Sequence, residues 1–238
     1  MQVPSGRRLS REDTKLLRLM AEYGFVRHSE TPFKLKSGVM SHVYVFGRDD
    51  LTDNPELEYA VGLRIADTIV DEIDTTGDTR KSVLIGLPTA GTPLAQAAAM
   101  VQRFRQMNTM RDLPVIAHRI MREKLKGDHG VHNTWVNGKP DLGRHLYWAV
   151  DNVVTDGGTK VEDAAKLAQD GYPAMEMPSI IFVDRQQGGL KRLTQAGFTK
   201  LIVVFNLLDI TYAYGELGLW PKEAVKAVED EIKAHQFE

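Results

Sequence analysis

The chain has 238 residues, of which 42% are hydrophobic and 26% charged, a composition typical of a soluble globular protein. A net charge of −2 without a Lys/Arg run argues against a nucleic-acid partner, and the absence of cysteine excludes a disulfide framework, thiolate metal ligands and thiol catalysis. No apolar segment is long enough to span a membrane, and MQVPSGRRLS lacks the apolar core of a signal peptide, so we expect a cytoplasmic protein without a membrane partner.

Capping and turn signals predict the first elements of the chain. Ser10, followed three residues later by Asp13, predicts a capped first helix. The segment FKLKSGVMSHVYVFG, residues 33–47, predicts a strand or hairpin around a Ser-Gly turn. Asn54 and Pro55 are the expected N-cap and first residue of a long helix.

Five short apolar runs follow, and helical patterns separate most of them. The runs are Ser82–Gly86, Val115–His118, Leu146–Asp151, Ser179–Asp184 and Leu201–Phe205. The helical patterns are Thr92–Arg105, Thr159–Asp170 and Leu190–Ala196, followed by a terminal helix at Pro221–Gln236. Apolar strands that alternate with helices predict an α/β protein with a doubly wound, mostly parallel sheet flanked by helices. We expect one compact domain, with an N-terminal helix and hood segment in residues 1–50 and the core in residues 51–238.

The connection from Met121 to Arg144 is an exception to this alternation. It is rich in Gly, Asp, Asn, Lys and His and has no apolar periodicity. A polar segment of this length inside a compact domain is usually functional or mobile. We expect the part from Arg122 to Trp135 to become ordered when a ligand binds.

The stretch LYWAVDNVVTDGGTKVEDA, residues 146–164, joins an apolar strand to a helix through a glycine turn. Ligands of parallel α/β sheets bind beyond the carboxyl ends of the strands, and we place Asp151 at such an end. Gly157 and Gly158 let backbone N–H groups converge, and the helix that begins near Thr159 adds the positive end of its dipole, so the turn can bind a phosphate. The structural alternative is a simple glycine turn before a helix, with a solvated Asp151. These residues alone leave both readings open.

The run AVDNVVTDGGT resembles the phosphoribosyl-pyrophosphate (PRPP) signature of type I phosphoribosyltransferases. Other segments narrow the resemblance to orotate phosphoribosyltransferases. FKLKSGVMSHVYVFGR is similar to their N-terminal segment, GLPTAGTP to their pyrophosphate loop, KGDHG to the end of their mobile catalytic loop and VDRQQGG to their orotate-contacting segment. The matches follow the order of the family from Phe33 to Gly189.

The resemblance implies transfer of the phosphoribosyl group from PRPP to orotate, giving orotidine 5′-monophosphate and pyrophosphate in pyrimidine (UMP) synthesis. It also implies a homodimer with shared active sites, and Mg²⁺ bound mainly through PRPP with Asp151 nearby. The implied catalytic residues are Lys124, Lys126, His129 and Asp151. Those implied to bind PRPP are Lys36, Pro88, Thr89, Ala90, Gly91, Arg122, Asp151, Asn152, Val153, Val154, Thr155, Asp156, Gly157, Gly158 and Thr159. Those implied to bind orotate are Tyr44, Val45, Thr155 and Arg185, the last through the orotate carboxylate.

The chain departs from the family pattern at several positions. Asn152 replaces the second acid of the signature, which removes a charge that attracts Mg²⁺. Asp156 replaces the second Thr of the phosphate loop and would repel a phosphate if its side chain pointed inward. Ala90 stands where some relatives have Lys, and an apparent one-residue insertion leaves open whether Lys124 or Lys126 is the catalytic loop lysine.

Several candidate residues also have structural interpretations. The loop lysines can simply be solvated, Val45 can be a core residue, and Arg185 can form a surface ion pair with Asp184 or another carboxylate. His129 and His132 have the spacing of a metal pair but no third ligand at suitable spacing, so we do not expect a zinc site.

Three other functions compete with orotate transfer. A phosphoribosyltransferase for another base is disfavoured by the Lys36 segment and Arg185. A catalytically weak regulatory protein that senses PRPP or a nucleotide is favoured by Asn152 and Asp156. A DNA-binding regulator is disfavoured because no basic helix-turn-helix pattern precedes the domain.

Overall fold

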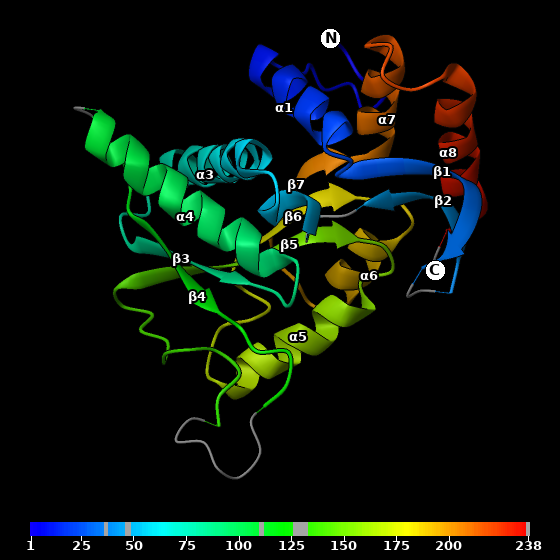
Figure 1. Cartoon of the computed structure of the whole chain (residues 1–238). Coiled ribbons are helices and arrows are strands. Elements are labelled where there is room, and N and C mark those ends of the chain that lie inside the picture. Colours follow the sequence, from blue (N-terminus) through cyan, green and yellow to red (C-terminus); the bar gives the residue numbers. More distant parts are fainter. Residues whose placement is uncertain (36–37, 46–48, 110–111, 126–132, 237–238) are drawn as a thin grey trace.

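A five-stranded parallel sheet forms the centre of the protein, with strand order β4-β3-β5-β6-β7 (Figure 1). The computed structural model describes residues 1–35, 38–45, 49–109, 112–125 and 133–236. The strands are β3 (Lys81–Gly86), β4 (Ile116–Ile120), β5 (His145–Val154), β6 (Ser179–Asp184) and β7 (Leu201–Asn206). The strand order reverses after β3, because the chain adds β4 on one side and then returns to place β5 on the other. Ligands of such sheets bind at this switch point, beyond the carboxyl ends of β3 and β5.

Helices cover both faces of the sheet. On the upper face in Figure 1 lie α1 (Arg11–Glu22), α3 (Pro55–Thr76), α4 (Gly91–Asn108) and α7 (Leu207–Glu216). Below the sheet lie α5 (Gly158–Gln169) and α6 (Gly189–Gln195). Alternate residues of β5 serve the two sides: Trp148 and Val150 join one buried apolar cluster, and Tyr147 and Ala149 join the other. This two-sided burial explains why the strands are continuous apolar runs.

An antiparallel hairpin lies beside one end of the sheet and forms the hood. It consists of β1 (Val26–Lys34) and β2 (Met40–Val45), and a short helix, α2 (Asp49–Thr52), follows it. The terminal helix α8 (Lys222–Ala234) lies next to β2 (Figure 1). The buried residues of α8 are Ala224, Val228 and Ile232, and the neighbouring Val225 is half-buried.

The structure confirms the predicted fold class and most of the predicted elements. Ser10 caps α1 through the expected capping box: its side chain accepts from the Asp13 N–H, and Asp13 accepts from the Ser10 N–H. The predicted strands and helices are present with small shifts at their ends. Helix α7 was not predicted; it starts directly after β7 with Asn206 as its N-cap, and its buried residues include Leu207 and Ile210.

One boundary prediction is wrong, and it concerns the candidate site. Strand β5 does not end at Asp151 but continues to Val154. The reason is the neighbouring strand, because Val153 and Val154 still pair with Val183 and Asp184 of β6. Asp151 is therefore held inside a sheet ladder rather than in a loop.

The polar connection lies only partly within the described residues. In its described part, β-bridge pairing joins Met121 to Val136. The predicted ordering of Arg122–Trp135 falls largely on residues 126–132, which lie outside the described part, and stays a prediction. Among the described residues, no helix combines the length and apolar character that crossing a membrane requires.

Candidate active site

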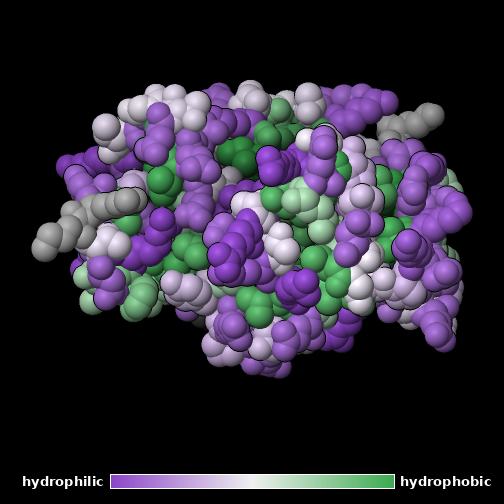
Figure 2. All heavy atoms as spheres, turned by 90° about the horizontal axis from the view of Figure 1, so that it is seen from above, coloured by the Kyte–Doolittle hydropathy of each residue, from purple (hydrophilic) through white to green (hydrophobic). Residues whose placement is uncertain are grey.

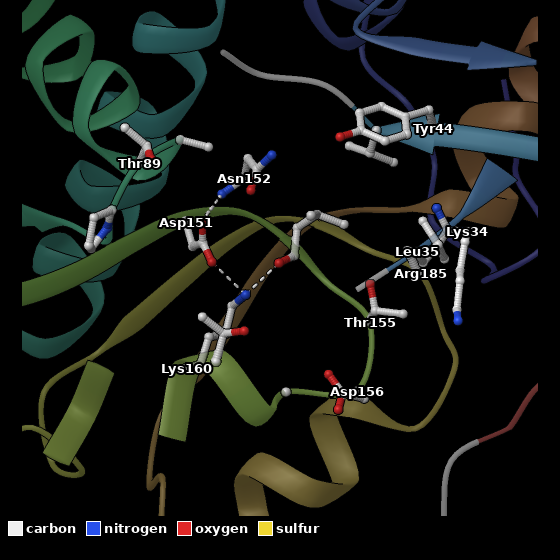
Figure 3. Close-up of a pocket in the computed structure, with 16 residues that line it drawn as sticks. Lys34, Leu35, Tyr44, Thr89, Asp151, Asn152, Thr155, Asp156, Lys160 and Arg185 are labelled. Atoms are coloured by element: carbon white, nitrogen blue, oxygen red, sulfur yellow. Dashed lines mark hydrogen bonds and ion pairs between the residues drawn. The ribbon is translucent and has the colours of Figure 1, made fainter. Parts of the chain in front are cut away.

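A pocket of 390 Å³ lies at the switch point of the sheet. Figure 3 shows Thr89 on one side of it, Tyr44 of the hairpin on the other, and Asp151 and Asn152 of β5 between them. The lining residues are Lys34, Leu35, Tyr44, Val45, Pro88, Thr89, Ala90, Asp151, Asn152, Val153, Thr155, Asp156, Gly157, Thr159, Lys160 and Arg185. The structure therefore brings together residues from four of the motifs that the sequence singled out.

The loop between β3 and α4 reaches the pocket because two glycines let it pack closely. A Cβ atom on Gly91 would lie 2.1 Å from the carbonyl oxygen of Val150, and one on Gly86 would lie 2.3 Å from the carbonyl oxygen of Gly91. The loop is thus pressed against β5, and its residues 88–90 line the pocket, with a cis peptide bond between Pro88 and Thr89. Gly91 itself does not line the pocket; it makes the close approach possible.

The glycine turn after β5 leads directly into α5. Gly157 has a φ of 78°, a left-handed conformation that glycine adopts without strain, and α5 begins at Gly158. The Asp156 carboxylate accepts a hydrogen bond from the Gly158 N–H at 3.3 Å and pairs with Arg192 of α6 at 2.8 Å. Asp156 therefore lines the pocket with its charge balanced by Arg192, although it uses one of the amides that would bind a phosphate.

Asp151 forms an ion pair that sequence reasoning missed. Its Oδ2 atom lies 2.6 Å from Nζ of Lys160, and its Oδ1 atom accepts from the Asn152 N–H at 2.8 Å. Lys160 also donates to the carbonyl oxygen of Val153. The available signal was the position of Lys160 in the first turn of the helix that follows the phosphate turn, from which its stem can run back under the strand.

Arg185 lies at the opposite end of the pocket and is 1% exposed. Its Nε donates to Gln187, Nη1 to the carbonyl oxygen of Val43, and Nη2 to both Ser41 and Glu231 of α8, the last at 3.0 Å. Burial lowers the pKa of Arg185, and the charge of Glu231 acts in the opposite direction.

The structural alternative for Arg185, an ion pair with Asp184 or another carboxylate, is confirmed as an ion pair, but neither its surface position nor Asp184 as its partner is correct. The ion pair is buried, and its acid is Glu231, which the fold brings from the C-terminal helix. Asp184 instead accepts from the Gln186 N–H. Burial raises the pKa of Asp184, against the effects of that hydrogen bond and of the charge of Lys160.

The remaining predicted residues fall into three groups. Val45 is buried and Tyr44 is 39% exposed, and both line the pocket as expected. The residues that do not line it are Gly91, Arg122, Lys124, Val154 and Gly158. Those outside the described part of the chain are Lys36, Lys126 and His129. Lys34 and Leu35 line the pocket without having been predicted.

The described donor set does not fit a metal ion held by the protein alone. Within the described ranges, His, Cys, Asp and Glu nowhere gather in a group of three suited to a metal. At Asp151, both carboxylate oxygens already have partners, and one of them is the ammonium group of Lys160.

Comparison with known proteins shows sequence similarity to orotate phosphoribosyltransferases. No protein-family model matches the chain. It is 28% identical to an orotate phosphoribosyltransferase of Leptospira biflexa over 177 residues, which cover 73% of this chain and 84% of the relative. It is 26% identical to one from Aquifex aeolicus over 200 residues, which cover 84% of this chain and 97% of the relative.

Solved structures share the fold. UMP synthase of Leishmania donovani superimposes with a TM-score of 0.70 at 21% identity over 93% of this chain and 42% of that one, so this chain spans less than half of that protein. Orotate phosphoribosyltransferase of Francisella tularensis superimposes with a TM-score of 0.62 at 16% identity over 94% of this chain and 100% of that one. The comparisons confirm the resemblance to orotate phosphoribosyltransferases that the motifs indicated, and they confirm the predicted fold. They also support phosphoribosyltransferase activity for this chain.

Proposed function

We propose that the protein transfers the phosphoribosyl group of PRPP to orotate, giving orotidine 5′-monophosphate and pyrophosphate in pyrimidine synthesis. The observation that carries this proposal is the composition of one pocket: residues 88–90, the turn at residues 155–159 and the hairpin residues Tyr44 and Val45 all contribute to its wall. The resemblance implied diphosphate, phosphate and base binding for these three segments. Relatives that bear the name orotate phosphoribosyltransferase support orotate as the base.

The arrangement suits a reaction that depends on positioning. The turn before α5 would bind the 5′-phosphate, the loop before α4 would bind the diphosphate, and the base would lie between the hairpin and Thr155. Holding the two reactants in this way removes much of the entropic barrier to their reaction. The carboxylate of Asp151 lies between these subsites. It would accept hydrogen bonds from ribose hydroxyl groups and stabilise the positive charge that develops on the ribose as pyrophosphate leaves.

Mg²⁺ enters this proposal as a companion of PRPP. When bound, it would neutralise charge on the diphosphate. We assign it to the ligand because the described residues offer no set of three acidic or imidazole ligands. The catalytic roles of Lys124, Lys126 and His129 remain proposals based on resemblance.

The direct test is to mix the protein with Mg²⁺, PRPP and orotate and to follow the loss of orotate absorbance. We expect turnover with orotate and none with adenine, and loss of turnover in Asp151→Asn. A second candidate is a regulatory protein that binds PRPP without turning it over, which Asp156 favours because its carboxylate occupies an amide of the phosphate turn. Binding of PRPP without consumption of orotate would support that candidate and overturn the enzyme proposal.

We also infer that the protein forms a homodimer through α4. Met100, Phe104 and Met107 form a stripe on one face of this helix and are 63%, 55% and 69% exposed. Tyr59 of α3 extends the stripe through an edge contact with Phe104, at a centroid distance of 6.5 Å. Figure 2 shows a largely hydrophilic upper face with separate hydrophobic patches. The exposed apolar side chains of α4 form a surface that a second copy would cover. Phe104→Glu should shift the mass in solution from dimer to monomer, and an unchanged mass would contradict the inferred interface.

A further inference from the structure

We propose that Lys160 is a positioning residue that serves as the resident cation of this site. In this proposal, which rests on the proposed function, its ammonium group holds the Asp151 carboxylate in place and balances its charge, so that the protein binds PRPP without a divalent ion of its own.

The contacts of Lys160 distinguish it from an ordinary surface lysine. Its side chain is only 8% exposed, and that of Asp151 is 17% exposed. Its ammonium group contacts the Asp151 carboxylate at 2.6 Å and the carbonyl oxygen of Val153. A buried charge requires such partners, since an unpaired ammonium would lose its hydration without compensation. Lys160 and Asp151 both line the pocket, so the pair belongs to the site and not only to the interior.

The local fold explains how the pair forms. Asp151 lies within β5, the chain turns at Gly157, and α5 brings Lys160 back beneath the strand. Figure 3 shows Lys160 extending from α5 towards Asp151 and making both contacts, with Asn152 farther along the strand. The sheet ladder fixes Asp151 from one side and the helix fixes Lys160 from the other, so the orientation of the carboxylate is set before a ligand binds.

The charges around the pair determine what it favours. Asp163, on the same helix, pairs with Lys166 at 2.8 Å, and Asp184 of β6 accepts from a backbone N–H. The charge of Lys160 acts to lower the pKa of both acids, but among the described contacts its ion-pair partner is Asp151. The residue after Asp151 is the neutral Asn152. This part of β5 therefore adds no unbalanced negative charge to the pocket wall. A bare dication at Asp151 would face the ammonium group, whereas an anionic ligand would not face an unbalanced carboxylate.

The test measures binding of PRPP by calorimetry, once with Mg²⁺ and once with chelator, in the full chain and in Lys160→Met. Methionine keeps the apolar stem and removes the charge. We expect the wild-type protein to retain PRPP binding in chelator. Lys160→Met should lose about tenfold to a hundredfold in affinity there, the range for a lost charge-assisted contact, and should recover part of it with Mg²⁺. Lys160→Arg should bind more like the wild type.

A matched control separates this role from bracing of the helix. Lys166→Met removes the neighbouring ion pair on α5, which does not line the pocket, and should leave the Mg²⁺ dependence of PRPP binding unchanged. Equal Mg²⁺ dependence in the wild type and Lys160→Met, or a change only in melting temperature, would overturn the role of Lys160.

A measurement without PRPP keeps this inference separate from the proposed function. Titration with Mn²⁺ alone, followed by paramagnetic broadening, should show no binding at this site in the wild type and weak binding in Lys160→Met and Lys160→Gln. Binding of Mn²⁺ at the wild-type site would overturn the resident-cation role. Failure of PRPP to bind the wild type under any condition would instead overturn the proposed function, whatever the Mn²⁺ result.

Discussion

The two ends of the pocket are built in different ways. At the end proposed to bind phosphate, called the phosphate end, Asp151 pairs with Lys160 nine positions away, and Asp156 accepts from the Gly158 N–H two positions away. At the end proposed to bind the base, called the base end, Arg185 is held by Ser41, Val43 and Glu231, at sequence separations of 144, 142 and 46. The phosphate end is therefore largely a property of one strand–turn–helix segment, and the base end exists only after the hairpin and the terminal helix have docked.

This difference has a consequence for electrostatics. At the phosphate end, Lys160 and Arg192 of the protein itself balance the two acids. Backbone amides and a helix N-terminus are then left to attract an anion. At the base end, an internal acid balances the cation, because Glu231 takes part of the guanidinium of Arg185. The proposed recognition of the orotate carboxylate by Arg185 would therefore use the donor capacity that Val43, Ser41, Gln187 and Glu231 leave.

The largest expected effect comes from removing Arg185. Arg185→Ala leaves the 8% exposed side chain of Glu231 without its ion-pair partner and deprives Ser41 and Val43 of a donor. Breaking a buried pair in this way typically costs about 3–5 kcal/mol, so chemical denaturation should show a loss of that order in the free energy of unfolding. As a control, Lys226→Ala breaks an exposed ion pair with Asp230 on α8, the helix that carries Glu231. It should change the free energy of unfolding by less than about 1 kcal/mol.

A double variant separates the structural role of Arg185 from its predicted role in base binding. Arg185→Met combined with Glu231→Leu replaces the pair by apolar side chains and should recover much of the lost stability. If Arg185 also contacts orotate, the recovered protein should still bind orotate poorly while PRPP affinity stays close to that of the wild type. Normal orotate affinity in the double variant would contradict base recognition by Arg185.

The next effect belongs to the phosphate end. Asp156→Thr removes a carboxylate from the pocket wall and frees the Gly158 N–H, while Arg192 becomes available to the ligand. We expect PRPP and ribose 5-phosphate to bind more tightly by about tenfold, in the range of one charge-assisted hydrogen bond. Calorimetry with both ligands checks this, and the gain should shrink as ionic strength rises. Weaker binding in the variant would show that Asp156 supports the turn more than it repels the phosphate.

The same contrast explains what the sequence could predict. The capping box of α1 depends on neighbours in the chain, so a local pattern was enough to place it. The Pro88–Ala90 loop was placed by resemblance to a known family, because its packing against β5 is not visible in a local pattern. Lys160 was missed because a lysine in a first helical turn has no pattern that shows whether its side chain faces solvent or runs back under a strand. The partner of Arg185 could not be predicted, because Glu231 lies on an otherwise ordinary amphipathic helix and reaches Arg185 only through tertiary packing.

A smaller effect should follow from neutralising the acid at the base end. In Glu231→Gln, the side chain can still accept from Arg185 or from the His42 N–H, but its amide group cannot accept from both. We expect a loss of roughly 1–2 kcal/mol in stability. Because the positive charge of Arg185 is then no longer balanced by Glu231, the preference for orotate over uracil should rise several-fold in competition binding. An unchanged preference would show that Glu231 does not modulate the base subsite.

The smallest effect is expected at Asn152. A carboxylate at this position would restore a negative charge close to the PRPP site, and carboxylates attract Mg²⁺ more strongly than amide oxygens do. Lys160 already balances Asp151, so Asn152→Asp adds one uncompensated charge, which should attract the Mg²⁺ that accompanies PRPP and repel the diphosphate itself. These effects oppose each other, and we expect a net tightening of Mg²⁺–PRPP binding of only about twofold to fivefold, with a lower Mg²⁺ concentration at half-maximal binding.

In chelator, the same variant should bind PRPP more weakly than the wild type. Identical Mg²⁺ titration curves for the two proteins would place residue 152 outside the electrostatic environment of the metal.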